Sequence, residues 1–153
     1  MYLTRQADYT MRLLIHLALQ PDRTATIAEV AEHYGISGNH LVKVAHHAIH
    51  AGFVAGTRGR GGGIRLAKNA NEIGIGEVLR AVEDWKIVEC FDPTSNTCQI
   101  AGVCGLQSVL KEAMKAWFAV LDKYTLADVI RRKTLLVELL SLGTARHSVG
   151  RRS

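Results

Sequence analysis

The chain has 153 residues, of which 48% are hydrophobic and 22% charged, with a formal net charge of +5. These values are typical of a globular protein with one domain, or one domain and a dimerisation extension. No run of about 18 apolar residues is present, so no transmembrane helix is expected, and the N-terminus lacks the layout of a secretory signal. We therefore expect a cytoplasmic protein with no membrane partner.

The positive charge is concentrated in one part of the chain. No acidic residue occurs between Glu32 and Glu72, and acidic residues return immediately after that segment. A block of one sign predicts a surface that binds a polyanion, whereas chance clustering on a solvated surface is the alternative. The basic residues of the block are Lys43, Arg58, Arg60, Arg65 and Lys68.

The first two expected helices precede a short turn. Apolar residues at helical spacing predict a helix over residues 4–20, which ends at Pro21. A second helix begins after Thr26, where Thr26 and Glu29 form the pattern of a capping box, and it ends at Tyr34.

Residues 35–37 form the turn of an expected helix-turn-helix, since Gly ends a helix and Ser caps the next. The following helix, residues 38–51, has an apolar stripe and an opposite face of hydrogen-bond donors, as a recognition helix requires. The stripe comprises Leu41, Val44, Ala45, Ala48 and Ile49. The candidate DNA contacts in this region are Thr26, Ser37, Gly38, Asn39, His40 and Lys43.

Four histidines in the same helix raise the alternative of a metal site. His46 and His50 are four residues apart, but no nearby carboxylate or thiol completes a ligand set. We therefore interpret His40, His46, His47 and His50 as surface donors.

A β-hairpin is expected over residues 53–66, with strands at 53–54 and 64–66 and a glycine-rich tip at 59–63. Beside a recognition helix such a hairpin is a wing, and Arg58 and Arg60 are its candidate contacts to phosphates or the minor groove. A phosphate-binding loop is the alternative, but the P-loop Lys-Ser/Thr pair is absent and a strand follows in place of a helix.

Three cysteines, Cys90, Cys98 and Cys104, lie within fifteen residues and are the only ones in the chain. Structural zinc sites normally contain a close pair of cysteines and a fourth ligand, and neither pattern occurs here. The spacing matches no ferredoxin pattern. From the residues alone, an iron–sulfur cluster, a thiol redox switch, a zinc site and an inert loop all remain open.

A long helix over residues 105–124 has an apolar face, which we interpret as a dimer contact because a winged helix offers little more core; packing on its own domain is the alternative. A further helix is expected around 126–142. The chain then divides into a winged helix-turn-helix (1–83), a cysteine loop (84–104), the two C-terminal helices (105–142) and a disordered tail (143–153).

Several segments together resemble the iron–sulfur winged-helix regulators typified by IscR, NsrR and RirA. These segments are LTRQADYTMRLL, YGISGNHLVKV, VAGTRGRGGGIRLAK, IGIGEVLRAVED, the three cysteines and LDKYTLADVI. The resemblance covers roughly residues 1–140. It implies a mainly α fold with a small hairpin wing, a homodimer with crossed long helices, and a cluster held by Cys90, Cys98 and Cys104. In NsrR-type members an aspartate of the first helix, supplied by the partner subunit, is the fourth ligand, and Asp8 lies at that position.

The segments GNHLVKV and DKYTLADV are most similar to NsrR, while the seven-residue gap between the first two cysteines is similar to RirA. We therefore expect a repressor that binds a double-stranded DNA operator and senses nitric oxide through a cluster, 4Fe–4S in preference to 2Fe–2S. An iron-responsive regulator and a clusterless thiol or zinc-stabilised regulator are the alternatives. An enzyme is not expected, because no catalytic constellation is present.

Overall fold

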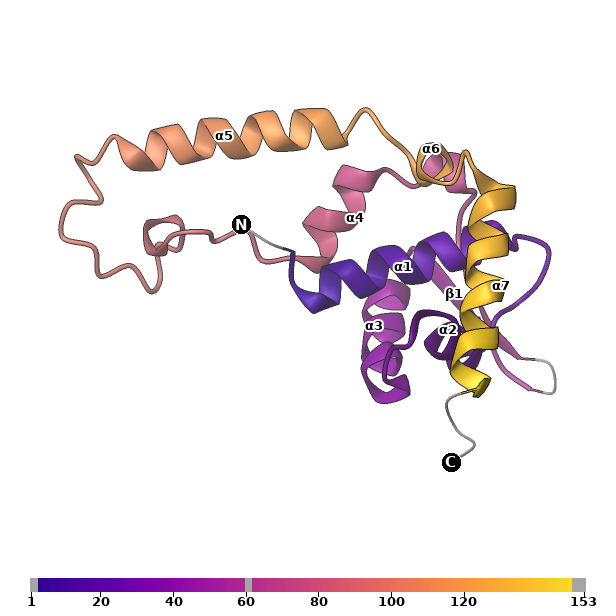
Figure 1. The fold of residues 1–153 in the computed structure, drawn as a ribbon. Helices are drawn as coiled ribbons and strands as arrows, with labels where there is room; N and C mark the ends of the chain where they lie inside the picture. Colours follow the sequence, from indigo (N-terminus) through magenta and orange to yellow (C-terminus); the bar gives the residue numbers. More distant parts are fainter. Residues whose placement is uncertain (1–2, 60–61, 150–153) are drawn as a thin grey trace.

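The computed structural model describes residues 3–59 and 62–149, with side chains described as far as residue 141. The fold is mainly helical and has one two-stranded antiparallel sheet, as the sequence predicted (Figure 1). The elements in chain order are α1 Arg5–Leu19, α2 Ile27–Tyr34, α3 Gly38–His50, β1 Val54–Thr57, β2 Gly63–Leu66, η1 Ala70–Glu72, α4 Ile75–Val82, η2 Glu89–Phe91, α5 Leu106–Leu121, α6 Leu126–Val129 and α7 Lys133–Val149.

Local capping determines where the helix-turn-helix elements begin and end. The Thr26 hydroxyl accepts a hydrogen bond from the backbone N–H of Glu29, and the Glu29 carboxylate accepts from the backbone N–H of Thr26, so the predicted capping box is present. Gly35 ends α2 in the left-handed conformation with φ of 63°, which glycine adopts without a Cβ clash. The three residues 35–37 then turn the chain into α3.

The main core lies between α1, α2, α3 and the hairpin. Four of the five residues predicted for the apolar stripe of α3 are buried in it: Leu41, Val44, Ala45 and Ala48. Ile49 is an exception, because it is 38% exposed. It lies at the edge of the stripe beside β1, where the glycine at position 56 has no side chain to cover it.

The hairpin is joined to the helix-turn-helix by backbone hydrogen bonds. Strand β2 pairs with β1 in the register Val54↔Leu66, and on its other side Ile64 forms a bridge with Ala25, just before α2. Both bonds of the Ala25–Ile64 bridge are well formed, at 2.9 and 2.8 Å. The hairpin is therefore fixed to the N-terminal end of α2.

Residues 83–121 form an arm that extends from this body. In Figure 1, α4 leads away from α1, the loop that follows runs outward, and α5 returns along it. A second, smaller core holds the base of the arm, where Phe118 of α5 packs on α4 and α1. Trp85 meets Phe118 edge to face at a centroid separation of 4.8 Å.

The chain re-enters the body after the arm. The backbone N–H of Leu126 donates to the carbonyl of Ile73 (2.8 Å), and the N–H of Ile75 donates to the carbonyl of Tyr124 (3.0 Å). The Leu126 side chain is fully buried in the main core. The winged-helix body therefore contains residues from both sides of the arm.

The C-terminal region differs from the expected single helix over 126–142 and disordered tail. A turn separates the short α6 from α7, and α7 packs against α2 and α1. The structure continues α7 to Val149, so residues 143–149, expected to be disordered, are helical; residues 150–153 lie outside the described part of the chain. A single glycine at 143 costs a helix only about 1 kcal/mol, which the helix-forming neighbours offset.

None of the helices in the described part of the chain is long and apolar enough to cross a membrane.

Candidate nucleic-acid interface and cysteine site

The outer face of α3 presents the predicted donors to solvent. Ser37, Gly38, Asn39, His40 and Lys43 are all exposed, and the helix contains no acidic residue. The Ser37 side chain makes no capping bond. The His40 ring is edge-on to Tyr9 of α1, at a centroid separation of 6.3 Å. The start of α3 is thus an uncovered cluster of donors in front of a buried apolar stripe, the arrangement that a recognition helix uses in the major groove.

Thr26 lies at the N-terminus of α2, and its hydroxyl already accepts the capping bond from Glu29. Thr26 is exposed, so the hydroxyl proton remains available for a phosphate oxygen. Hydrogen bonding from Arg23 holds the pKa of Glu29 below its usual range, so Glu29 is ionised while it accepts the capping bond.

The wing is closed by one threonine. The Thr57 hydroxyl accepts from the N–H of Gly63 (3.1 Å) and donates to its carbonyl (3.2 Å), directly below the tip. Arg58 is exposed beyond this closure, and Gly59 has a positive φ of 101° that lets the chain turn. Arg60, the other predicted wing contact, lies outside the described residues.

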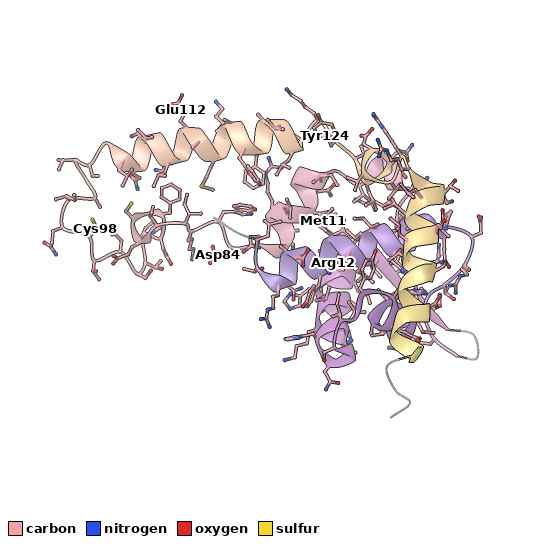
Figure 2. The ribbon with its side chains drawn as sticks, in the orientation of Figure 1. Met11, Arg12, Asp84, Cys98, Glu112 and Tyr124 are labelled. Atoms are coloured by element: carbon pink, nitrogen blue, oxygen red, sulfur yellow. The ribbon has the colours of Figure 1, made fainter. Side chains whose placement is uncertain are left out.

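The three cysteines are free thiols distributed along the arm. Cys90 lies in η2, Cys98 lies on the outer loop, and Cys104 precedes α5 by two residues. Figure 2 shows Cys98 at the outer part of the arm, far from α1. A hydrogen bond from Gln107 Nε2 to the carbonyl oxygen of Cys90 (2.7 Å) joins the first turn of α5 to η2, and so connects the segments of Cys90 and Cys104.

Two carboxylates shape the arm loop around the cysteines. Glu89 accepts hydrogen bonds from both the backbone N–H and the hydroxyl of Thr97, the residue before Cys98. Asp92 accepts from the Thr94 hydroxyl and pairs with Lys86 at 2.9 Å. These bonds hold the pKa of both carboxyl groups below the usual range, so both are ionised while they hold the loop.

Apolar side chains surround the cysteines but remain uncovered within one chain. Val103, next to Cys104, is 89% exposed, and Ile100, Leu106 and Val109 are exposed as well. Three thiols in such surroundings fit an iron–sulfur cluster, whose ligands are cysteine thiolates and whose properties depend on exclusion of solvent. The apolar cover would have to come from a second chain.

Asp8, the predicted fourth ligand, lies in the first turn of α1 and pairs with Arg12, one turn later, at 2.9 Å. Figure 2 shows Arg12 on the body of the molecule, well separated from Cys98. One chain therefore does not bring Asp8 to its own cysteines. A ligand role for Asp8 requires the partner subunit and remains a prediction.

A different group of candidate ligands was missed by the sequence analysis. His16, Glu29 and His33 have ligand atoms within 4.8 Å of one another, and they are the one such group in the part of the chain that the structure describes. The spacing of Glu29 and His33, one helical turn apart, is a signal that the sequence contains. His16 comes from another helix, which no local pattern reveals.

Comparison with known proteins assigns the family. The family model Rrf2, described as an iron-dependent transcriptional regulator, matches residues 3–132. The chain belongs to the Rrf2 family. Two relatives are named HTH-type transcriptional regulator NsrR. The one from Bacillus subtilis is 49% identical over 144 residues, covering 93% of this chain and 99% of the relative. The one from Halalkalibacterium halodurans is 46% identical with the same coverage.

Solved Rrf2-like structures agree with the fold. IscR from T. potens has a TM-score of 0.70 at 25% identity, covering 86% of this chain and 88% of that one. CymR from Staphylococcus aureus has a TM-score of 0.65 at 23% identity, covering 84% and 97% respectively. The mainly α winged-helix prediction and the family resemblance are thereby confirmed. This Rrf2 protein is an NsrR-type transcription regulator and not an enzyme, as expected.

Proposed function

We propose that this Rrf2 protein is a homodimeric repressor that binds a pseudo-palindromic DNA operator and releases it when nitric oxide reaches an iron–sulfur cluster on the arm. The observation that carries the proposal is the set of three free cysteines amid exposed apolar residues, in a chain 49% identical to an NsrR. A DNA ligand implies that the protein acts in the cytoplasm.

DNA recognition is assigned to two surfaces of the body. The exposed donors of residues 37–43 enter the major groove, where Asn39 has the side chain best suited to adenine and Lys43 suits guanine or phosphate. Thr26 at the start of α2 contacts a phosphate. The wing follows the backbone or the adjacent minor groove through Arg58 and Arg60.

Dimerisation is assigned to α5. Its residues Leu106, Val109, Trp117 and Val120 are exposed and lie on one side of the helix, while Phe118 faces the body. An uncovered apolar stripe of this kind buries itself against its own copy in a two-fold dimer. Two bodies held in this way would meet two half-sites about one turn of DNA apart.

Cys90, Cys98 and Cys104 would hold the cluster, which we assign as 4Fe–4S in preference to 2Fe–2S, with Asp8 of the partner subunit as the fourth ligand. When bound, the cluster supplies iron that reacts with nitric oxide at the position without a thiolate. Cys98 is the exposed member of the three cysteines, and Cys90 and Cys104 are half-buried. To bind the cluster, the Asp8 carboxylate would have to give up its ion pair with Arg12.

A mechanical connection runs from the cysteines to the body. The Gln107–Cys90 bond makes the position of η2 sensitive to the start of α5. The far end of α5 is fixed to α4 by Phe118 and by a bidentate pair between Arg80 and Asp122 (2.7 Å for each bond). A rearranged loop therefore shifts α5 and α4 together, and α4 packs on α1. Coupling requires that this shift changes the spacing of the two recognition helices.

The test uses anaerobically purified full-length protein. Iron and sulfide content, the visible spectrum and operator binding are measured before and after titration with nitric oxide, and separately with an iron chelator. Cys98→Ser should lose the cluster and the response to nitric oxide, whereas Ser108→Ala, an exposed change on the first turns of α5, should retain both.

Operator affinity that is untouched by nitric oxide would refute the proposed signal. Release by the chelator alone would establish the iron-responsive alternative, which the seven-residue cysteine gap favours, and colourless iron-free protein would establish the thiol or zinc alternative.

A further inference from the structure

A group of three potential metal ligands lies inside the body, away from the cysteines. His16 comes from the C-terminal half of α1, and Glu29 and His33 come from successive turns of α2. Their ligand atoms lie within 4.8 Å of one another. The rings of the two histidines are 5.0 Å apart, centroid to centroid, with 31° between their planes.

His16 is the side chain that calls for an explanation. It is only 1% exposed, and neither of its ring nitrogens has a hydrogen-bond partner among the described residues. The Nδ1 of His33 is likewise buried without one. A buried polar group left unpaired costs about 1–3 kcal/mol, so three such nitrogens on two neighbouring rings favour a bound ligand, to which each ring can offer one nitrogen.

The protonation of His16 suits a metal ligand. Burial, together with the neighbouring His33, lowers the pKa of His16 to about 4. The imidazole is therefore neutral at pH 7 and has a free lone pair, which is the form that binds a metal.

Glu29 supplies the negative charge of the group. Its carboxylate forms an ion pair with Arg23 and accepts the capping bond of Thr26. Arg23 donates to both oxygens of this carboxylate, through Nη1 to Oε2 and through Nη2 to Oε1, so a bound cation would take over one of these two positions. Arg23 is half exposed.

We propose that His16, Glu29 and His33 form a metal site for a divalent borderline cation, of which Zn²⁺ is the representative. Two imidazoles and one carboxylate are a recognised three-ligand set for zinc, and imidazole also suits the other late divalent metals. Ligand atoms that each lie about 2.1 Å from a tetrahedral metal ion are about 3.4 Å from one another. The ligand atoms of His16, Glu29 and His33 lie within 4.8 Å of one another, so they would have to approach by about 1.4 Å at most to bind the ion.

The surroundings provide the remaining coordination position. A cavity of about 30 Å³ adjoins both histidines and is lined on its far side by Val137, Leu140 and Ser141 of α7. Space of this size holds a water molecule, which completes the tetrahedron. The apolar cover of α7 limits exchange with solvent. The metal would connect α1 to α2, and thus fix the first helix of the helix-turn-helix on the helix that carries Asp8.

The experiment is a zinc titration of the cluster-loaded full-length protein, followed by isothermal calorimetry and by thermal unfolding with and without excess zinc. The variants are His33→Gln and Glu29→Gln, and the latter keeps the capping box because glutamine also serves at that position. His47→Gln, which removes an exposed histidine of α3, is the matched control. Circular dichroism checks that each variant is folded.

We expect one zinc ion per chain bound through this site, with affinity reduced at least about 100-fold in His33→Gln and Glu29→Gln and unchanged in His47→Gln. Zinc should raise the unfolding midpoint of the unmodified protein and of His47→Gln only, by about 5 °C or more. Equal zinc affinity in all four proteins would overturn the proposal. If the cysteines hold no cluster and bind zinc themselves, the same additional binding phase should appear in all four proteins. That result would count against the cluster assignment, and the site at His16 would still be judged from the difference between the variants.

Discussion

The exposed residues at the start of α3 differ in what they can recognise. Lys43 is a point charge on a flexible stem, whereas Asn39 has the paired donor and acceptor that read adenine. Lys43 lies one turn beyond Asn39, on the same face of the helix. In the proposed DNA complex, Lys43 would therefore contribute affinity for the DNA backbone and Asn39 would contribute recognition of sequence.

Lys43→Ala should weaken binding to operator and to random DNA by a similar factor, because it removes one phosphate neutralisation. The slope of log affinity against log salt concentration should fall in magnitude by about 1. Fluorescence anisotropy at several salt concentrations measures this slope. Lys123→Ala, beyond the far end of α5, is the control and should leave the slope unchanged. An unchanged slope in Lys43→Ala would remove this residue from the interface.

Gly63 is where the wing approaches the segment before α2 most closely. A Cβ added at this position would lie 2.6 Å from the carbonyl oxygen of Ala25, a backbone atom that cannot move aside alone. Gly63→Ala should therefore open the Ala25–Ile64 bridge and destabilise the protein by about 1–3 kcal/mol. Urea unfolding measures the loss. Gly102→Ala is the control, because a Cβ there meets nothing within 4 Å; equal stability of both variants would contradict this account.

At the residue scale, the sequence predicted what depends on neighbours along the chain. The capping box of Thr26 and Glu29 and the buried stripe of α3 follow from spacing alone. The exposure of Ile49 depends on a glycine of another element, and the group around His16 depends on two helices meeting. Such contacts have no signature in the local pattern.

The junction of α4 and α5 is the element through which the arm meets the body. A Cβ at Gly76 would clash with the carboxylate of Asp122, the partner of Arg80. The Arg80 guanidinium also lies over the Phe118 ring, 4.1 Å from its centroid. Gly76 therefore allows the ion pair and the ring contact to exist together.

Gly76→Ala should displace Asp122 and loosen the end of α5, with faster hydrogen exchange of the amides of residues 114–121. The exchange of α3 should remain as it was, since α3 does not depend on this junction. Gly105→Ala is the control, because a Cβ there meets nothing within 4 Å in a backbone already helical (φ −67°, ψ −19°). Equal exchange in the two variants would show that the ion pair does not hold the arm.

Val109→Glu tests the proposed dimer contact of α5. A carboxylate in the middle of the exposed stripe would be buried unpaired in a dimer, at a cost of several kcal/mol. The protein should become monomeric in analytical ultracentrifugation and lose most of its operator affinity. Ala119→Glu, on the same face as Lys115, should stay dimeric. A dimeric Val109→Glu protein would place the subunit contact elsewhere.

At the element scale, helical periodicity predicted the ends of α1, α2 and α3 to within one residue, because each has a clear apolar stripe or cap, while the predicted end of α5 was three residues too late. The break between α6 and α7 was missed. Thr125 and Asp128 form a capping box that starts α6, but the buried face of α6 is only one turn long and its packing on Ile73 is a tertiary contact.

The return of α6 makes the winged-helix body depend on residues beyond the arm. Leu126→Ala should cost about 2–5 kcal/mol, the range for a fully buried leucine. Thermal or urea unfolding of the apoprotein measures it. Val129→Ala, an exposed neighbour on the same short helix, should change stability by less than about 1 kcal/mol. A similar loss in both would mean that α6 contributes through its backbone alone.

At the scale of the whole molecule, the sequence predicted the fold class because charge, turns and motif order all agree with one architecture. The predicted segment boundaries at residues 83 and 104 follow the order of elements along the chain, but they do not separate units that pack independently. The main core takes Leu126 and Ile130 from beyond both divisions. Contacts between segments that are distant in sequence decide this arrangement.

The late closure of the body around Leu126 has a consequence for synthesis and damage in the cell. A ribosome has translated all three cysteines before the last pieces of the DNA-reading core emerge. A chain that is cut or terminated within the arm therefore lacks the rest of the arm and also Leu126 and Ile130 of the main core. Because cells degrade incompletely folded chains, we expect such a fragment to be removed before it can act as a regulator that binds DNA without responding to a signal.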